Sequence, residues 1–100
     1  MSKESLEFKE RSFFVGDIVR HFKYELMSEE EKARNPRMHM YEVLGFATHT
    51  ETDELLVIYK ALYAPFDTFA RPADMFLSEV DHEKYPNIKQ QFRLEKVEGQ

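Results

Sequence analysis

The chain has 100 residues, of which 42% are hydrophobic and 33% are charged, a balance typical of one globular domain rather than of a disordered segment. It contains no cysteine, which excludes disulfides, thiolate catalysis and cysteine zinc sites. No segment has the ~20 apolar residues of a membrane span, and residues 1–14 lack the apolar run of a signal peptide. We therefore expect a single cytoplasmic domain over residues 1–100.

The formal net charge of −5 is concentrated in the middle of the chain. Residues 41–80 carry two basic and seven acidic side chains, whereas residues 1–40 have eight of each sign and residues 81–100 have four of each. An acidic central segment argues against nonspecific binding to a nucleic-acid backbone. It remains compatible with a site for one nucleotide around a single arginine.

The first third of the chain combines an apolar N-terminal segment with a charged loop. Residues 3–14 could form a short helix or an extended arm, and residues 15–23 are typical of a strand opened by a Gly-Asp turn. Residues 24–39 resemble a loop insertion with one helical turn. Ser28 and Glu31 predict a capping box at the start of that turn.

Residues 40–49 and 54–63 predict two antiparallel strands joined by a polar turn. The register that best matches side chains across the pair puts an apolar face with an ion pair on one side of the sheet. The cross-strand pairs of this register are Glu42–Lys60, Leu44–Ile58 and Phe46–Leu56. Its opposite face gathers Tyr41, His49, Tyr59 and Tyr63.

The last third of the chain contains shorter elements. Residues 67–71, 77–80 and 91–97 suit three short strands, and Pro72 opens a helical turn. Several short strands with a long loop after the first predict a mostly β fold. We expect a small SH3-like bent barrel of about five strands with a short helical insertion. A two-layer α+β domain, with an N-terminal helix on the sheet, is the alternative.

The tyrosine face is the strongest functional feature of the sequence. Tyr41, Tyr59 and Tyr63 offer aromatic walls with hydroxyl tips. Arg71, held stiffly before Pro72, can take a carboxylate or a phosphate in bidentate fashion. These residues predict a groove for a small anionic ligand, a nucleotide or a peptide segment, and hence a binding module.

Two residues of the first predicted strand could also contact a ligand in this groove. Arg20 and His21 add further hydrogen-bond donors. The alternative is a tyrosine-rich core in which Arg71 is paired with Asp74 or Glu51.

His49 and Glu51 suggest a second hypothesis, a small acid/base enzyme, because a carboxylate can fix the tautomer of an imidazole base. His21 could replace His49 in this role, with Arg71 as an anion clamp. An ordinary hairpin turn over residues 48–53 is the alternative. The scattered histidines predict no metal site, and the serines and glycines form neither a nucleophile elbow nor a phosphate-cradling loop. We expect no cofactor and favour binding over catalysis.

A third hypothesis is a protein interaction or assembly module. A patch of Phe8, Phe13 and Phe14, together with residues 24–39, could present a surface to a protein partner. We expect no membrane partner.

Four motifs resemble a bacterial family, domain of unknown function 1653, and the likeness covers roughly residues 15–95 in order and spacing. The motifs are RHFK (20–23), YEVLGFATHTET (41–52), LVIYKALY (56–63) and ARPADMF (70–76). The resemblance implies a small, mostly β, cytoplasmic protein without an established activity. The residues that match the family pattern are Arg20, His21, Tyr41, His49, Glu51, Tyr59, Tyr63, Arg71 and Pro72.

The sequence departs from that pattern in three places. Residues 24–39 replace a compact Lys-Gly turn, Ala64 follows Tyr63 where glycine is common, and Phe69 stands where tryptophan is common. If that tryptophan stacks on a ligand in relatives, Phe69 implies a weaker stack here.

Overall fold

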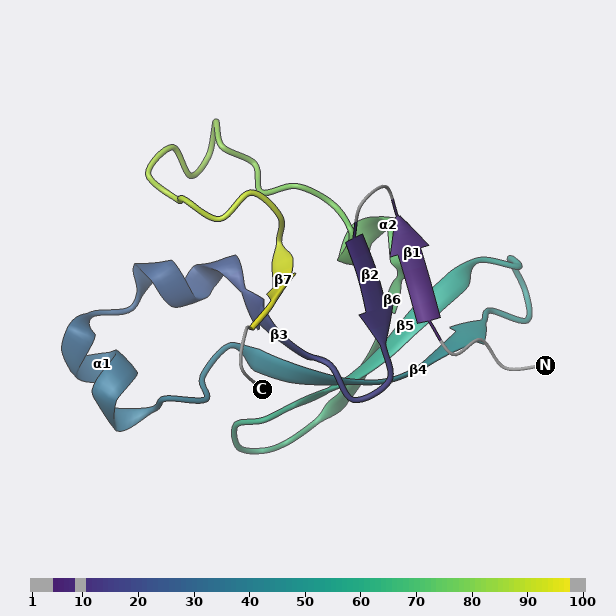
Figure 1. Cartoon of the computed structure of the whole chain (residues 1–100), viewed down its shortest axis with the longest axis horizontal. Coiled ribbons are helices and arrows are strands. Elements are labelled where there is room, and N and C mark those ends of the chain that lie inside the picture. The colour runs from purple at the N-terminus through teal and green to yellow at the C-terminus, as the bar shows by residue number, and fades with distance from the viewer. Residues whose placement is uncertain (1–4, 9–10, 98–100) are drawn as a thin grey trace.

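The computed structural model describes residues 5–8 and 11–97, and within them the chain forms seven strands and three short helical segments (Figure 1). The strands are β1 (Ser5–Phe8), β2 (Arg11–Phe14), β3 (Ile18–His21), β4 (Met40–Thr48), β5 (Leu55–Ala61), β6 (Thr68–Pro72) and β7 (Leu94–Lys96). The helical segments are η1 (Phe22–Leu26), α1 (Glu29–Arg34) and α2 (Ala73–Phe76). The predicted mostly β fold is confirmed.

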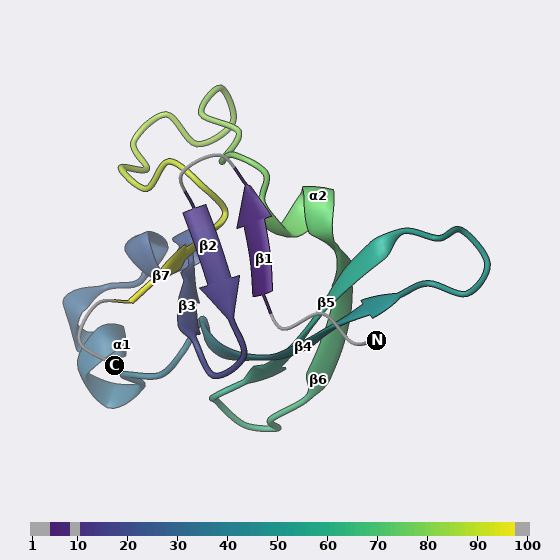
Figure 2. The ribbon, with the colours of Figure 1, turned by 45° about the vertical axis from the view of Figure 1, so that its right-hand side comes forward.

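The strands form two antiparallel sheets. One is the hairpin β1-β2, and the other is a bent five-stranded sheet in the order β6-β5-β4-β3-β7. Within the described residues β6 and β7 are the two ends of this sheet, so it bends without closing into a barrel. Figure 2 shows the hairpin standing over the five-stranded sheet.

For the N-terminal segment the sequence left open a short helix or an extended arm, and the helix is wrong because the described residues are extended. Residues 5–8 and 11–14 pair as a hairpin in which Leu6 lies opposite Phe13. Both side chains are buried, as expected when apolar residues alternate with polar ones along a strand. The predicted patch of exposed phenylalanines is wrong at Phe13, while Phe14 is 49% exposed. The side chain of Phe8 lies outside the described part of the chain.

The hairpin of β4 and β5 follows the predicted register only from Tyr41 to Val43. Glu42 lies opposite Lys60, as predicted, but a bulge at Leu44 shifts the pairing by one residue. Beyond it Gly45 faces Ile58 and Ala47 faces Leu56, so the predicted pairs Leu44–Ile58 and Phe46–Leu56 are wrong. A bulge inserts one unpaired residue and bends its strand, and this one also reverses which side chains of β4 face inward.

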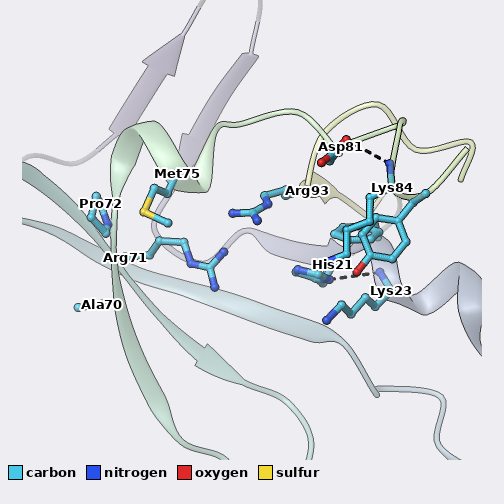
Figure 3. Close-up of a pocket in the computed structure, with 11 residues that line it drawn as sticks. His21, Lys23, Ala70, Arg71, Pro72, Met75, Asp81, Lys84 and Arg93 are labelled. Atoms are coloured by element: carbon cyan, nitrogen blue, oxygen red, sulfur yellow. Dashed lines mark hydrogen bonds between the residues drawn. The ribbon is translucent and has the colours of Figure 1, made fainter.

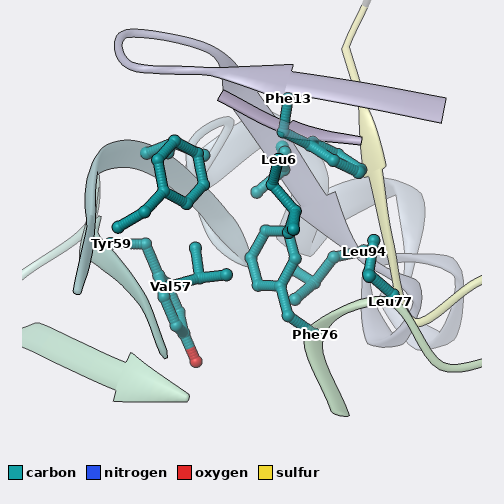
Figure 4. Close-up of a cluster of buried hydrophobic side chains, with 10 residues drawn as sticks. Leu6, Phe13, Val57, Tyr59, Phe76, Leu77 and Leu94 are labelled. Carbon is teal, nitrogen blue, oxygen red and sulfur yellow. The ribbon is translucent and has the colours of Figure 1, made fainter. Parts of the chain in front are cut away.

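The core lies on the tyrosine side of the sheet, as in the alternative of a tyrosine-rich core. Tyr59 is buried there, whereas Leu44 on the other side is 39% exposed. The bulge turns Phe46 toward the same side as Tyr59, and the hairpin β1-β2 and α2 cover this side (Figure 4). The buried cluster consists of Leu6, Phe13, Val19, Val43, Phe46, Val57, Tyr59, Phe76, Leu77 and Leu94.

The predicted starts of α1 and α2 are confirmed. Ser28 and Glu31 form the capping box of α1, with reciprocal hydrogen bonds of 3.1 and 2.9 Å. Pro72 is the N-cap of α2. Phe76 at the end of α2 is fully buried, and its ring meets that of Phe13 edge-on at 5.3 Å.

The C-terminal strands are shorter than predicted. Residues 77–80 contribute a single bridge, between Glu79 and Phe92, and the last strand covers only Leu94–Lys96. The long loop between α2 and β7 packs through a second buried cluster, Phe22, Val80 and Ile88, with Tyr85 against it. This loop forms one wall of the site described next.

Candidate anion-binding site

Strand alternation places four of the predicted site residues on one face of the sheet. Val19 pairs with Tyr41, and His21 lies two residues after Val19, so both point to the face of Tyr41. Tyr59 and Arg71 share that face, because Arg71 pairs with Val57 on β5. The inward side of β3, β4, β5 and β6 thus carries one candidate residue per strand.

Tyr41 contacts both Tyr59 and Tyr63. The hydroxyls of Tyr41 and Tyr63 are hydrogen-bonded at 2.6 Å, and the rings of Tyr41 and Tyr59 meet edge-on at 5.3 Å. Burial, followed by the hydrogen bond to Tyr63, raises the pKa of Tyr41. Burial raises the pKa of Tyr59 as well, and the nearby Arg71 guanidinium opposes that shift. The hydroxyls of Tyr41 and Tyr59 are therefore neutral at pH 7 and act as hydrogen-bonding groups, not as bases.

A pocket of about 570 Å³ opens next to Arg71, whose guanidinium lies near Tyr59 (Figure 3). Arg71 reaches it from β6, and Arg93 reaches the same space from the segment before β7. His21 and Lys23 lie on the far wall, below the loop that carries Lys84. We call these five residues the cationic pocket. The other lining residues are Phe22, Ala70, Pro72, Met75, Asp81 and Tyr85.

The cations of this pocket have no carboxylate partners among the described residues. The ion pairs of the described residues lie elsewhere and join Lys32 to Glu29, Arg34 to Glu30 and Lys96 to Asp17. The predicted alternative, an ion pair of Arg71 with Asp74 or Glu51, is therefore not observed. The acidic residue in the pocket lining, Asp81, accepts hydrogen bonds from the backbone amides of Glu83 and Lys84 at 3.1 and 3.2 Å. A concentration of uncompensated positive charge in a concave site favours an anion.

His21 is a neutral donor in this setting. Its pKa is lowered to about 4, first by burial and then by the charges of His39, Arg71, Lys23 and Arg93, in that order. Its Nδ1 accepts a hydrogen bond of 3.2 Å from the backbone amide of Lys23. A neutral imidazole that accepts at Nδ1 carries its proton on Nε2. That N–H is the group His21 can offer to a ligand.

Of the predicted site residues, only His21 and Arg71 line the pocket; those that do not line it are Arg20, Tyr41, His49, Glu51, Tyr59 and Tyr63. Arg20 points to the opposite face of β3, where its guanidinium stacks on the ring of Tyr24 at 4.1 Å. His49 and Glu51 belong to the β4–β5 turn. There the backbone amide of Glu51 donates to Nδ1 of His49 at 3.1 Å. This is the geometry of the turn alternative, because the carboxylate of Glu51 does not orient the imidazole.

Three residues of the pocket were not predicted: Lys23, Lys84 and Arg93. Lys23 belongs to η1, beyond the end of β3, so the alternation of that strand gives no signal for it. Lys84 and Arg93 come from a loop whose course depends on the packing of Val80 and Ile88 against Phe22, and no local pattern indicates this.

The described residues bear on two other classes of function. They contain no group of three or more His, Cys, Asp or Glu side chains that could hold a metal ion. None of the helices in this part of the chain has the length and apolar character needed to cross a membrane.

Comparison with known proteins identifies the family. The sequence profile of a family described as Protein of unknown function (DUF1653) matches residues 17–96, and the chain belongs to this family, as its motifs predicted. The matched range contains the five-stranded sheet and all lining residues of the pocket, whereas the hairpin β1-β2 precedes it. Neither the curated proteins nor the solved structures yield a match to this chain.

Proposed function

We propose that this DUF1653 protein is a binding module that holds a small anionic ligand in the cationic pocket. The observation that carries the proposal is the set of Lys23, Arg71, Lys84 and Arg93 around one cavity, without ion-pair partners among the described residues. The chain as a whole is acidic, with a net charge of −5, so this concentration of positive charge is local. The bacterial origin and cytoplasmic location implied by the family motifs belong to the same proposal.

The side chains of the pocket suit recognition of an anion by hydrogen bonds. Arg71 and Arg93 present planar guanidinium forks that bind carboxylate or phosphate oxygens in bidentate fashion. Lys23 and Lys84 add point charges, and the Nε2–H of His21 donates without the cost of burying a further charge. The tyrosine cluster supports the wall behind Arg71, because Tyr59 lies close to its guanidinium.

The same features favour binding over acid/base catalysis. A general base works best when its pKa lies near the working pH, whereas the pKa of His21 is lowered to about 4. The one hydrogen bond described for its ring comes from a backbone amide, and no carboxylate orients it. A group of this kind contributes a directed hydrogen bond and not proton abstraction at pH 7.

The proposal is tested by titrating ¹⁵N-labelled protein with inorganic phosphate, citrate and AMP and following the amide resonances. We expect shifts that cluster on His21, Arg71 and Arg93. Arg71→Gln should weaken binding by about tenfold or more, since a hydrogen bond to a charged group contributes about 1.5–3 kcal/mol.

The matched control is Arg37→Gln, which removes one positive charge from an exposed residue outside the pocket. It should leave affinity nearly unchanged. If none of the three anions moves the pocket resonances, or if both variants weaken binding equally, the pocket is not the site.

A further inference from the structure

The charge of the pocket exceeds what one phosphate can neutralise. Four permanent cations and one carboxylate line it, which leaves a net charge of +3 while His21 is neutral. A phosphomonoester carries about −1.5 to −2 at pH 7. A ligand with two or more linked phosphates matches this charge better.

The cations are also spread around the cavity. Lys23 follows β3, Arg71 lies on β6, Lys84 on the 81–85 turn and Arg93 just before β7. Figure 3 shows these side chains entering from separate walls and not from one edge. The volume, about 570 Å³, lies within the range of roughly 300–1,000 Å³ that is typical of sites for ligands of drug size. The site is therefore built for an extended anion.

An aromatic wall borders the charged part of the pocket. The imidazole of His21 lies 4.5 Å from the ring of Phe22 at an interplanar angle of 30°. Phe22 in turn meets Tyr85 edge-on at 5.0 Å. Phe22 is buried beneath, whereas Tyr85 is only half-buried and lines the cavity. A planar ring of a ligand can pack against Tyr85 while its charged end reaches the arginines.

We propose that the ligand is a nucleoside di- or triphosphate, with its phosphates between Arg71 and Arg93 and its base against Tyr85. This inference rests on the proposed function and specifies its ligand class. The linked phosphates use the separated cations, and the base uses the aromatic wall.

The test is isothermal titration calorimetry of the full chain at fixed ionic strength and without divalent cations. The probes are ADP, GDP, CDP, UDP, the four matching monophosphates, pyrophosphate and citrate. We expect the best diphosphate to bind about tenfold or more tightly than its monophosphate, and more tightly than pyrophosphate.

Each contrary result has a separate meaning. A monophosphate that binds as tightly as its diphosphate removes the linked phosphates from the inference but leaves an anion site. Pyrophosphate that equals the best nucleotide removes the base. Absence of binding by every probe, citrate included, overturns the proposed function together with the inference.

Two measurements locate the base. Tyr85→Leu should lower nucleotide affinity about tenfold, in line with the contribution of stacking on an aromatic side chain, and leave pyrophosphate affinity unchanged. Tyr24→Leu is the control, because Tyr24 stacks on Arg20 outside the pocket. In the unmodified protein, nuclear Overhauser effects from base protons should reach the Tyr85 ring. If those effects are absent, the base does not lie against Tyr85.

Discussion

The β4–β5 turn and the cationic pocket show how differently two candidate sites are built. The turn holds His49, Glu51 and Asp53 within a few residues of one another, and its hydrogen bonds are local: His49 and Glu54 pair through their backbones, and Glu51 donates to the His49 ring. The pocket brings His21 and Arg71 together with Arg93, across most of the chain. Side chains that satisfy one another locally have little left for a ligand, whereas the cations of the pocket lack carboxylate partners among the described residues.

The largest expected effect concerns the packing of α2, whose residue Met75 lines the pocket. Phe76→Ala empties a fully buried position at the end of α2, and loss of a buried phenylalanine costs about 3–5 kcal/mol. We expect urea unfolding to show that the free energy of unfolding decreases by this amount. The amide resonances of Arg71 and Ala73 should also shift. Met75→Ala, at a residue that is 47% exposed, should change stability by less than about 0.5 kcal/mol. Equal losses in both variants would contradict the packing described for α2.

The next test uses pH. The pKa of His21 falls from 6.5 to about 4 on folding, so between these pH values the unfolded chain binds more protons than the folded chain. The free energy of unfolding therefore decreases as the pH falls from about 6.5 toward 4. We expect about 1–2 kcal/mol, less than the full shift implies because the ring is partly exposed and solvent screens it. His21→Gln should flatten this part of the pH profile of unfolding free energy. His39 has a lowered pKa too, so some slope should persist. An identical profile in the variant would mean that His21 titrates normally.

A smaller effect tests the charge around His21 directly. Arg71→Gln removes one of the cations that lower the pKa of this histidine, so the pKa should rise toward its ordinary value. Addition of a bound anion to the unmodified protein should move it in the same direction. Both shifts can be read from the imidazole proton resonances across a pH titration. A pKa that stays in place after the substitution would place Arg71 too far from His21 for a common ligand.

The smallest expected effect lies in the turn. Glu51→Gln removes the carboxylate of an exposed residue but keeps the backbone amide that donates to His49. We expect unfolding free energy to change by no more than about 0.5 kcal/mol and affinity for phosphate, citrate and AMP to stay the same. A marked loss of affinity would restore the turn as a site and weaken the contrast with the pocket.

Local chemistry allowed several parts of the fold to be predicted. The capping box of Ser28 and Glu31, the helical turn after Pro72 and the pairing of Glu42 with Lys60 all depend on residues near one another in the chain or across one turn. The contact between Tyr41 and Tyr59 follows from strand alternation, which holds up to the bulge at Leu44, whereas Tyr63 lies beyond the end of β5. Periodicity of two is a property of any strand, and it needs no knowledge of the rest of the molecule.

The bulge at Leu44 could not be predicted from the local sequence. One unpaired residue moves Phe46 to the side of Tyr59, and no rule of alternation indicates where a strand will carry such a residue. The N-terminal hairpin is a second case. Its Arg11 donates to the backbone carbonyls of Leu77 and Leu94, more than 60 residues away, and only this docking explains why the segment pairs with itself and covers the core.

The sequence alone therefore determined the mostly β class, the family, the helix boundaries set by caps and proline, and the sharing of one face by the tyrosines. The tertiary structure decided which face is the core and which charges meet. Lys84 and Arg93 reach His21 and Arg71 because a loop folds back onto Phe22 through nonlocal apolar contacts. Such contacts are non-directional and depend on the area that they remove from water, so their partners cannot be read from spacing along the chain.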